Sequence, residues 1–199
     1  MVTPVCVLRS GPEYSARHVQ ALAKQVPGLV ALTDTAVPGV TTVPLRYDFP
    51  GWWAKLELFS GSIAGDLLYF DLDTVVLGGI APLLAAGRTT VLRDFYHPTT
   101  MGSGLMYISE RDKAEPWVNF VKDPGRIIST HKRFPLWGDQ GYLNGYIGRS
   151  QKWQDIIPGQ VVSYKRDCRK GLPPGARVVC FHGKPRPWDV SAAWIPKLP

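Results

Sequence analysis

The stretch Asp66-Leu67-Leu68-Tyr69-Phe70-Asp71-Leu72-Asp73 decides the fold of this chain. After its first residue the run 66–70 has no polar interruption, so we expect a central strand that is covered on both faces. Asp71 and Asp73 follow directly, and residues i and i+2 of an extended segment point to the same side. We therefore expect both carboxylates at the carboxyl end of a sheet strand, where open α/β folds bind ligands.

Two carboxylates at this spacing indicate a metal site. They repel each other unless a cation lies between them, and hard oxygen ligands suit Mg²⁺ or Mn²⁺. Such an ion can bridge a diphosphate and stabilise it as a leaving group. An Asp-x-Asp also occurs at ordinary turns and helix caps, so it is the apolar strand in front that favours the metal site.

The surrounding periodicity predicts an α/β fold. Residues 5–8 and 29–32 are short apolar runs typical of strands, and residues 15–26 between them have helical spacing. No repeat, low-complexity tract or linker interrupts the chain, so we expect one domain over residues 1–199. The remaining predicted elements are helices at 52–60, 80–86, 116–122 and 138–147 and strands at 89–92, 105–108 and 178–181.

Composition excludes several classes of protein. The chain has 199 residues, of which 45% are hydrophobic and 20% are charged, which is ordinary for a globular domain. No apolar run reaches the roughly 18 residues of a membrane span, and residues 1–10 do not resemble a secretory signal. Three widely spaced cysteines argue against a disulfide framework and a zinc knuckle. We expect a cytoplasmic protein.

The net charge of +7 is concentrated near the C-terminus. Residues 1–150 carry 14 Lys and Arg against 13 Asp and Glu, whereas residues 151–199 carry 9 against 3. This excess indicates an anionic partner such as nucleotide phosphates or a lipid surface, or else a solvated basic face. Only Trp153 and Tyr164 are interleaved with the basic residues, so we expect no nucleic-acid binding and at most peripheral membrane contact.

Four further segments accompany the acidic pair, and together they resemble a known family. They are Lys-Leu at 55–56, Gly-Ser-Gly at 102–104, Asp-Gln-x-x-Leu-Asn at 139–144 and His-Gly-Lys-Pro-Arg-Pro-Trp at 182–188. In this order and spacing the chain resembles glycosyltransferase family 8, which contains glycogenin and bacterial lipopolysaccharide galactosyl- and glucosyltransferases. The resemblance spans residues 5–188. Gly102 replaces an Asn of the family pattern, and segment 182–188 is shortened, with Arg186 in place of a Lys.

The resemblance implies a fold and a reaction. The fold would be a single-domain GT-A type, Rossmann-like, with a mixed, mainly parallel sheet flanked by helices. The reaction would be metal-dependent transfer of a hexose, with retention, from a nucleotide sugar to a carbohydrate or other hydroxyl acceptor. The nucleotide expected from the family is UDP.

The resemblance also assigns roles to residues. Asp71, Asp73 and His182 would hold the metal, and an imidazole ligand favours Mn²⁺ over Mg²⁺. Lys184 or Arg186 would contact the diphosphate, where Arg offers a planar fork for phosphate. Asp139 and Gln140 would face the anomeric carbon and the acceptor. The residues expected to bind the nucleotide sugar are Leu8, Lys55, Asp71, Leu72, Ser103, Lys184 and Arg186.

Two matters stay open at this point. A carboxylate forms a glycosyl ester more readily than an amide, so Asp139 is a better nucleophile candidate than Gln140, but a same-face attack without a covalent intermediate is equally compatible. The departures at Gly102 and 182–188 also allow a catalytically silent sugar-nucleotide or glycan-binding relative. A nucleotidyltransferase would use the paired aspartates but leaves His182 and Asp139 without a role.

Overall fold

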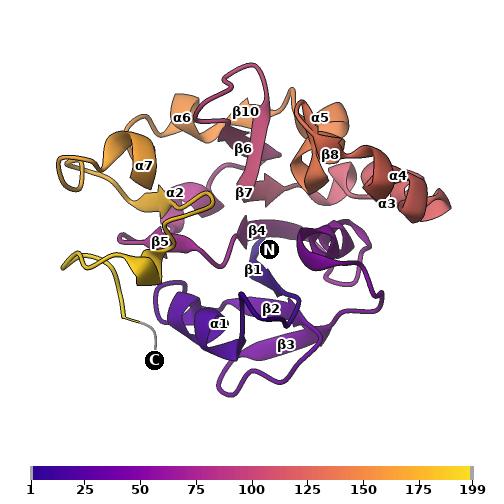
Figure 1. The fold of residues 1–199 in the computed structure, drawn as a ribbon, viewed down its shortest axis with the longest axis horizontal. Helices are drawn as coiled ribbons and strands as arrows, with labels where there is room; N and C mark the ends of the chain where they lie inside the picture. The colour runs from indigo at the N-terminus through magenta and orange to yellow at the C-terminus, as the bar shows by residue number, and fades with distance from the viewer. Residues whose placement is uncertain (1, 198–199) are drawn as a thin grey trace.

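The computed structural model describes residues 2–197, so Met1, Leu198 and Pro199 of the predicted domain 1–199 lie outside the described residues. Its main feature is a seven-stranded sheet with the order β10-β6-β7-β4-β1-β2-β3, flanked by helices (Figure 1). Strands β3, β2, β1 and β4 are parallel, and β7 runs antiparallel between β4 and β6. The strands are β1 (Val2–Leu8), β2 (Val30–Thr33), β3 (Thr41–Pro44), β4 (Asp66–Phe70), β6 (Thr90–Arg93), β7 (Met101–Ile108) and β10 (Gln151–Lys152).

Strand β4 lies in the middle of the sheet and is covered on both faces, as its apolar run predicts. Leu68 and Phe70 pack into one hydrophobic cluster with helix α1 (Ala16–Ala23), while Leu67 and Tyr69 pack into a second cluster with the 3₁₀ helix η1 (Gly51–Phe59). This alternation follows from the two-residue period of a strand. The prediction of a mixed, mainly parallel sheet flanked by helices is confirmed.

A second, three-stranded sheet brings the C-terminal segment to the acidic pair. It has the order β11-β12-β5, built from β5 (Thr74–Val76), β11 (Val161–Ser163) and β12 (Val178–Cys180). Asp73 immediately precedes β5, and Cys180 of β12 pairs with Thr74 of β5. The polypeptide that follows β12 therefore passes close to the turn at residues 71–73.

The helices and the remaining hairpin complete the fold. The hairpin consists of β8 (Lys132–Arg133) and β9 (Leu136–Trp137). None of the helices within residues 2–197 is long and apolar enough to cross a membrane. The other helices are α2 (Ala81–Leu84), η2 (Glu110–Asp112), α3 (Ala114–Lys122), α4 (Pro124–Thr130), α5 (Gly138–Ile147), α6 (Trp153–Ile156), α7 (Tyr164–Asp167) and η3 (Pro187–Asp189).

Each predicted strand forms, and so do most predicted helices. The predicted helix at 52–60 is a 3₁₀ helix rather than an α-helix. All its residues from Trp53 to Phe59 are buried, so tertiary packing rather than one apolar stripe sets its geometry. The sequence did not predict β3, β5, β8, β9, β10, β11, η2, η3, α6, α7 and α4. All of these except the seven-residue α4 are two to four residues long, which is too short to show a period.

Candidate active site

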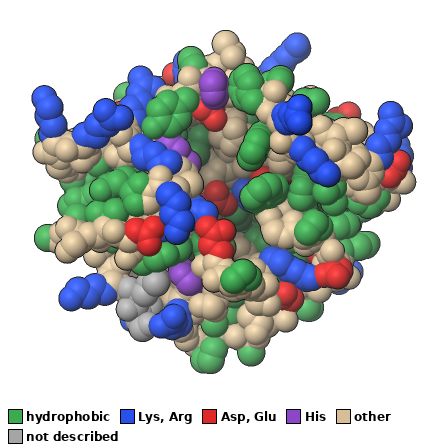
Figure 2. All heavy atoms as spheres, in the orientation of Figure 1, with side chains coloured by type: hydrophobic (Ala, Val, Ile, Leu, Met, Phe, Trp, Pro, Cys, Tyr) green, Lys and Arg blue, Asp and Glu red, His purple; other side chains and the backbone are tan. Residues whose placement is uncertain are grey.

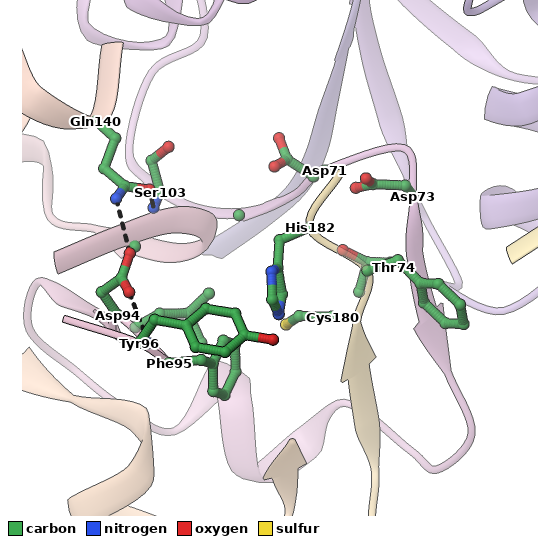
Figure 3. Close-up of a pocket in the computed structure, with 14 residues that line it drawn as sticks. Asp71, Asp73, Thr74, Asp94, Phe95, Tyr96, Ser103, Gln140, Cys180 and His182 are labelled. Carbon is green, nitrogen blue, oxygen red and sulfur yellow. Dashed lines mark hydrogen bonds between the residues drawn. The ribbon is translucent and has the colours of Figure 1, made fainter. Parts of the chain in front are cut away.

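The acidic pair lies where β4 ends, at the edge of a cavity. The Asp71 amide donates to the Gly104 carbonyl of β7 at 2.9 Å, and the Thr74 amide donates to the Asp71 carbonyl at 3.0 Å, so residues 71–74 form a tight turn. Asp73 is only 4% exposed. Both carboxylates face the cavity (Figure 3), whose lining is Asp71, Asp73, Thr74, Leu92, Asp94, Phe95, Tyr96, Gly102, Ser103, Gly104, Gln140, Cys180, Phe181 and His182.

Lys55 connects three of the predicted site residues. Its Nζ lies 3.1 Å from Asp71 Oδ1 and 3.0 Å from Asp139 Oδ2, and it donates to Ser103 Oγ at 3.1 Å. The side chain is buried on η1. Burial by itself lowers the pKa of Lys55, but Asp139 and Asp71 more than offset this and raise the pKa above its ordinary value. Lys55 is therefore a permanent cation beneath the acidic pair.

Asp139 and Gln140 lie at the start of α5 but have different surroundings. Asp139 is 5% exposed, and besides Lys55 it accepts a hydrogen bond from Ser103 Oγ at 2.8 Å. It does not line the cavity, whereas Gln140 does. Gln140 Nε2 donates to Asp94 Oδ2 at 3.0 Å, and its Oε1 accepts from the Ser103 amide (Figure 3). Of the two predicted catalytic residues, Gln140 is thus the one at the cavity wall.

Arg186 and Lys184 are placed very differently. The Arg186 guanidinium pairs with Asp73 and with Glu13, with Nε 3.0 Å from Glu13 Oε1, and it lies over the Tyr14 ring. The Lys184 side chain is 81% exposed and reaches only Asp189, at 3.7 Å. Despite its cationic partner, Asp73 has a pKa raised to about 7, first because it is buried and second because Asp71 is close.

His182 follows the small sheet and shares the cavity with the aspartates. Its Nε2 is 2.7 Å from Ser163 Oγ, and its ring stacks on Phe95. Burial, and then the nearby Lys165, lower its pKa, which favours the neutral imidazole that a metal ligand requires. Within residues 2–197, no three His, Cys, Asp or Glu side chains are grouped closely enough to hold a metal ion. Asp71, Asp73 and His182 therefore line one cavity without converging on one point.

Two predicted nucleotide-sugar contacts lie away from this cavity. Leu8 is completely buried in the hydrophobic core at the end of β1. Leu72 points to the opposite side of the 71–73 turn, where it lines a second, smaller cavity with Trp188.

Several residues of the site had not been identified from the sequence. Asp94 directly follows strand β6 as Asp71 follows β4, so a search for acidic residues at strand ends would have found it, although β6 itself begins with Thr90 and ends with Arg93. Ser163, which holds His182, and Glu13, which holds Arg186, are distant in sequence from their partners and carry no local signal.

Comparisons with known proteins identify the fold. No family model matches the chain. No curated protein matches it either. The solved structure of the galactosyltransferase LgtC with donor and acceptor sugar analogs has a TM-score of 0.63 at 13% identity, covering 94% of this chain and 89% of that one. The solved structure of the glycosyltransferase GlyE of Streptococcus pneumoniae TIGR4 has a TM-score of 0.61 at 14% identity, covering 97% of this chain and 58% of that one.

A further similar structure, the bifunctional glycosyltransferase WbbM, has a TM-score of 0.57 at 12% identity, with 94% of this chain and 46% of that chain covered. The chain thus spans nearly the whole of LgtC but only about half the length of GlyE and WbbM. What these proteins share with the chain is the GT-A glycosyltransferase fold.

Proposed function

We propose that this protein is a metal-dependent retaining glycosyltransferase of family 8, which transfers a hexose from a UDP-sugar to a hydroxyl acceptor. The observation that supports this most is the group in which buried Lys55 contacts Asp71, Ser103 and Asp139. It brings four separate family motifs together at the carboxyl end of a central strand, beside a cavity in a glycosyltransferase fold. That edge is where α/β folds bind their ligands.

Asp71 and Asp73 fit a divalent cation as two hard carboxylate ligands. Burial first, and the nearby Asp71 second, raise the pKa of Asp73, and a cation between the two carboxylates would offset both effects. The neutral imidazole of His182 faces the same cavity and suits Mn²⁺, but it would have to move toward the two carboxylates to become a further ligand. When bound, the ion would supply positive charge for the diphosphate leaving group.

The protein's own side chains would bind the diphosphate and position the reacting groups. Arg186, rather than the exposed Lys184, is placed to contact the diphosphate, because its guanidinium already lies on Asp73. Lys55 would hold Asp71 and Asp139 in position. Gln140 would face the reacting sugar from the cavity wall, while Asp139, behind it, would act through Lys55 and Ser103.

The direct test is incubation of the protein with Mn²⁺ and a panel of UDP-sugars, with and without sugar acceptors, while UDP release is measured. The expected result is UDP release that stops when the metal is chelated. Absence of UDP release in every combination, together with absence of metal-dependent nucleotide binding, would reject the proposal.

The Asp73→Asn variant tests the acidic pair. It should reduce turnover at least 100-fold, since removing a single group that stabilises developing charge costs about that factor. The matched control is Asp155→Asn, which alters an exposed aspartate paired with Arg93 on another part of the surface. The control should retain wild-type turnover, and near wild-type turnover in Asp73→Asn would contradict the proposal.

A catalytically silent relative that binds sugar nucleotides is the second candidate. The pairing of Arg186 with Asp73 favours it, because the guanidinium already neutralises one of the two carboxylates that a metal would need. This candidate predicts that UDP binds to the protein, with or without Mn²⁺, while hydrolysis and transfer are both absent.

A further inference from the structure

Four large aromatic side chains stay half exposed on three segments that adjoin the cavity. They are Trp52 (56% exposed), Tyr96 (53%), Phe134 (57%) and Trp137 (56%), and we call them the aromatic rim. They come from η1, from the loop after β6 and from the β8–β9 hairpin. Burying one such ring stabilises a protein by about 1.5–3 kcal/mol, so a group of rings left in water indicates a binding surface.

The three segments of the rim are in contact with one another. The ring of His97, next to Tyr96, lies against Phe134 with centroids 4.3 Å apart. Trp52 packs so closely on Gly138 that a Cβ there would lie 2.7 Å from its indole nitrogen. Gly138 directly follows Trp137 and has a φ of +59°, so glycine is needed at this junction for two reasons.

The rim continues into the candidate active site at both ends. Tyr96 lines the cavity and meets the His182 ring edge-on at 5.4 Å (Figure 3). At the other end, Trp137 and Gly138 lead into α5, where Gln140 lines the same cavity. Figure 2 shows hydrophobic side chains bordering the central hollow on the side of β8 and η1. A molecule whose reacting group lay beside Gln140 would extend outward over these rings.

We propose that the aromatic rim binds the sugar rings of a carbohydrate acceptor, an inference that rests on the proposed function. Flat, rigid rings offer a large apolar contact area at a low cost in conformational entropy. Sugar rings present apolar C–H faces that match such surfaces, and their hydroxyl groups need polar partners at the edge. Gln140 and Asp94 lie where the rim meets the cavity and offer such partners.

Two other occupants fit the rim less well. A symmetric second copy joined through the hairpin would bring the exposed Lys132 and Arg133 of both chains together, and like charges in an interface are unfavourable. A lipid bilayer would be contacted by a convex surface, whereas Tyr96 of the rim lines a cavity.

The test measures carbohydrate binding without donor or metal. Wild-type protein, Phe134→Ala and Trp137→Ala are applied to an array of immobilised glycans. The matched control is Val118→Ala, which truncates an apolar side chain on α3 that is 51% exposed and not part of the rim. Wild type and Val118→Ala should retain the same glycans, and each rim variant should lose at least 10-fold in affinity. Circular dichroism melting should show all variants folded, because the truncated side chains are half exposed.

Each outcome decides the matter. No glycan retained by wild type, or equal retention by the rim variants, overturns the inference. The inference is also overturned if no glycan binds and the rim variants instead abolish binding to phosphatidylcholine–phosphatidylglycerol vesicles. The same holds if no glycan binds and the rim variants abolish self-association in sedimentation. Failure of the proposed function gives a different result. Retention of glycans without any UDP release would support carbohydrate binding by the rim and reject the proposed transferase activity. Transfer with an unchanged acceptor KM in the rim variants rejects the inference alone.

Discussion

Lys55 has three oxygen partners and almost no contact with water. A buried charge is costly unless it is paired and fully hydrogen-bonded. Here Asp71, Ser103 and Asp139 supply the partners, and Tyr69 lies beneath the ammonium group with its ring centroid 5.2 Å away. In return the Lys55 ammonium group is the ionic partner of the buried Asp139 carboxyl group. At the scale of single residues, each charged side chain of the site therefore depends on the others for its hydrogen bonds and ion pairs.

Removing the lysine should expose this dependence. Lys55→Met should lower the free energy of unfolding by about 3–5 kcal/mol, because it leaves Asp139 charged and buried without its partner. Urea unfolding followed by tryptophan fluorescence provides the measurement. The double variant Lys55→Met/Asp139→Asn should lose less than the sum of the single variants. Strictly additive losses would contradict the coupling.

Asp66 should make stability depend on pH. It accepts hydrogen bonds from Tyr107 Oη at 2.6 Å and from the Glu110 amide at 2.8 Å. The bond from Tyr107 is the larger cause, and the bond from Glu110 the second, of a pKa that lies below the ordinary 3.8. Because the folded-state pKa is below the unfolded one, its contribution is full above about pH 4 and is lost as the pH falls through the lower value.

The Asp66→Asn variant should accordingly be less stable than wild type by about 1 kcal/mol at pH 7. The difference should shrink in unfolding experiments at progressively lower pH, as wild-type Asp66 also becomes protonated. A difference that stays constant with pH would show that the carboxylate charge is not involved.

Among the elements, α5 depends most on close packing. It carries Asp139 and Gln140, and it lies against the β9 strand so tightly that a Cβ on Gly141 would be 2.5 Å from the Leu136 carbonyl carbon. Gly145 of the same helix has no neighbouring atom within 4 Å of such a Cβ. The two glycines therefore have different reasons to be glycine, although both are found in a helix interior.

Alanine substitutions should have opposite effects at these two positions. Gly145→Ala should raise the free energy of unfolding by about 0.5–1 kcal/mol, since alanine is the better helix residue. Gly141→Ala should lower it by about 1–3 kcal/mol, because the helix must move away from the hairpin. Thermal and urea unfolding of both variants provide the comparison, and a stabilised Gly141→Ala would contradict the packing described.

In the molecule as a whole, segments that are far apart in the sequence meet at Asp73, beside the candidate active-site cavity. Arg186 follows the last strand, yet it binds Glu13 after the first strand and Asp73 after the central one. The pairing of β5 with β12 brings the C-terminal segment to this place. The same guanidinium thus closes the fold and neutralises the carboxylate that is proposed to bind the metal.

Arg186 and a divalent cation should therefore compete for Asp73. If the proposed metal site is right, Arg186→Ala should bind Mn²⁺ about fivefold more tightly than wild type when no nucleotide is present, which corresponds to about 1 kcal/mol of lost competition. Electron paramagnetic resonance of free Mn²⁺ gives the affinity. Glu13→Gln, which leaves the Arg186–Asp73 pair in place, is the control and should not bind Mn²⁺ more tightly. Equal affinities in all three proteins would exclude the competition.

The sequence by itself determined local features of this protein, namely single strands and the order of its motifs. The apolar run before Asp71 specified a central strand, because a segment covered on both faces cannot contain polar interruptions. The order of the motifs around Lys55, Ser103 and Asp139 anticipated residues that the fold brings within hydrogen-bonding distance. The 3₁₀ geometry of η1 and the short strands β5 and β11 were not predictable, since their hydrogen-bonding partners lie far away in the chain.

Only the tertiary structure distinguished Arg186 from Lys184. The two basic residues are two positions apart in one segment, and nothing local shows that one is inserted between Glu13 and Asp73 while the other remains in water. The same holds for Gln140 at the cavity wall and Asp139 behind it. Residue types and spacing specify which chemistry is available, whereas burial and long-range pairing decide which side chain reaches the cavity, because these depend on contacts between distant parts of the chain.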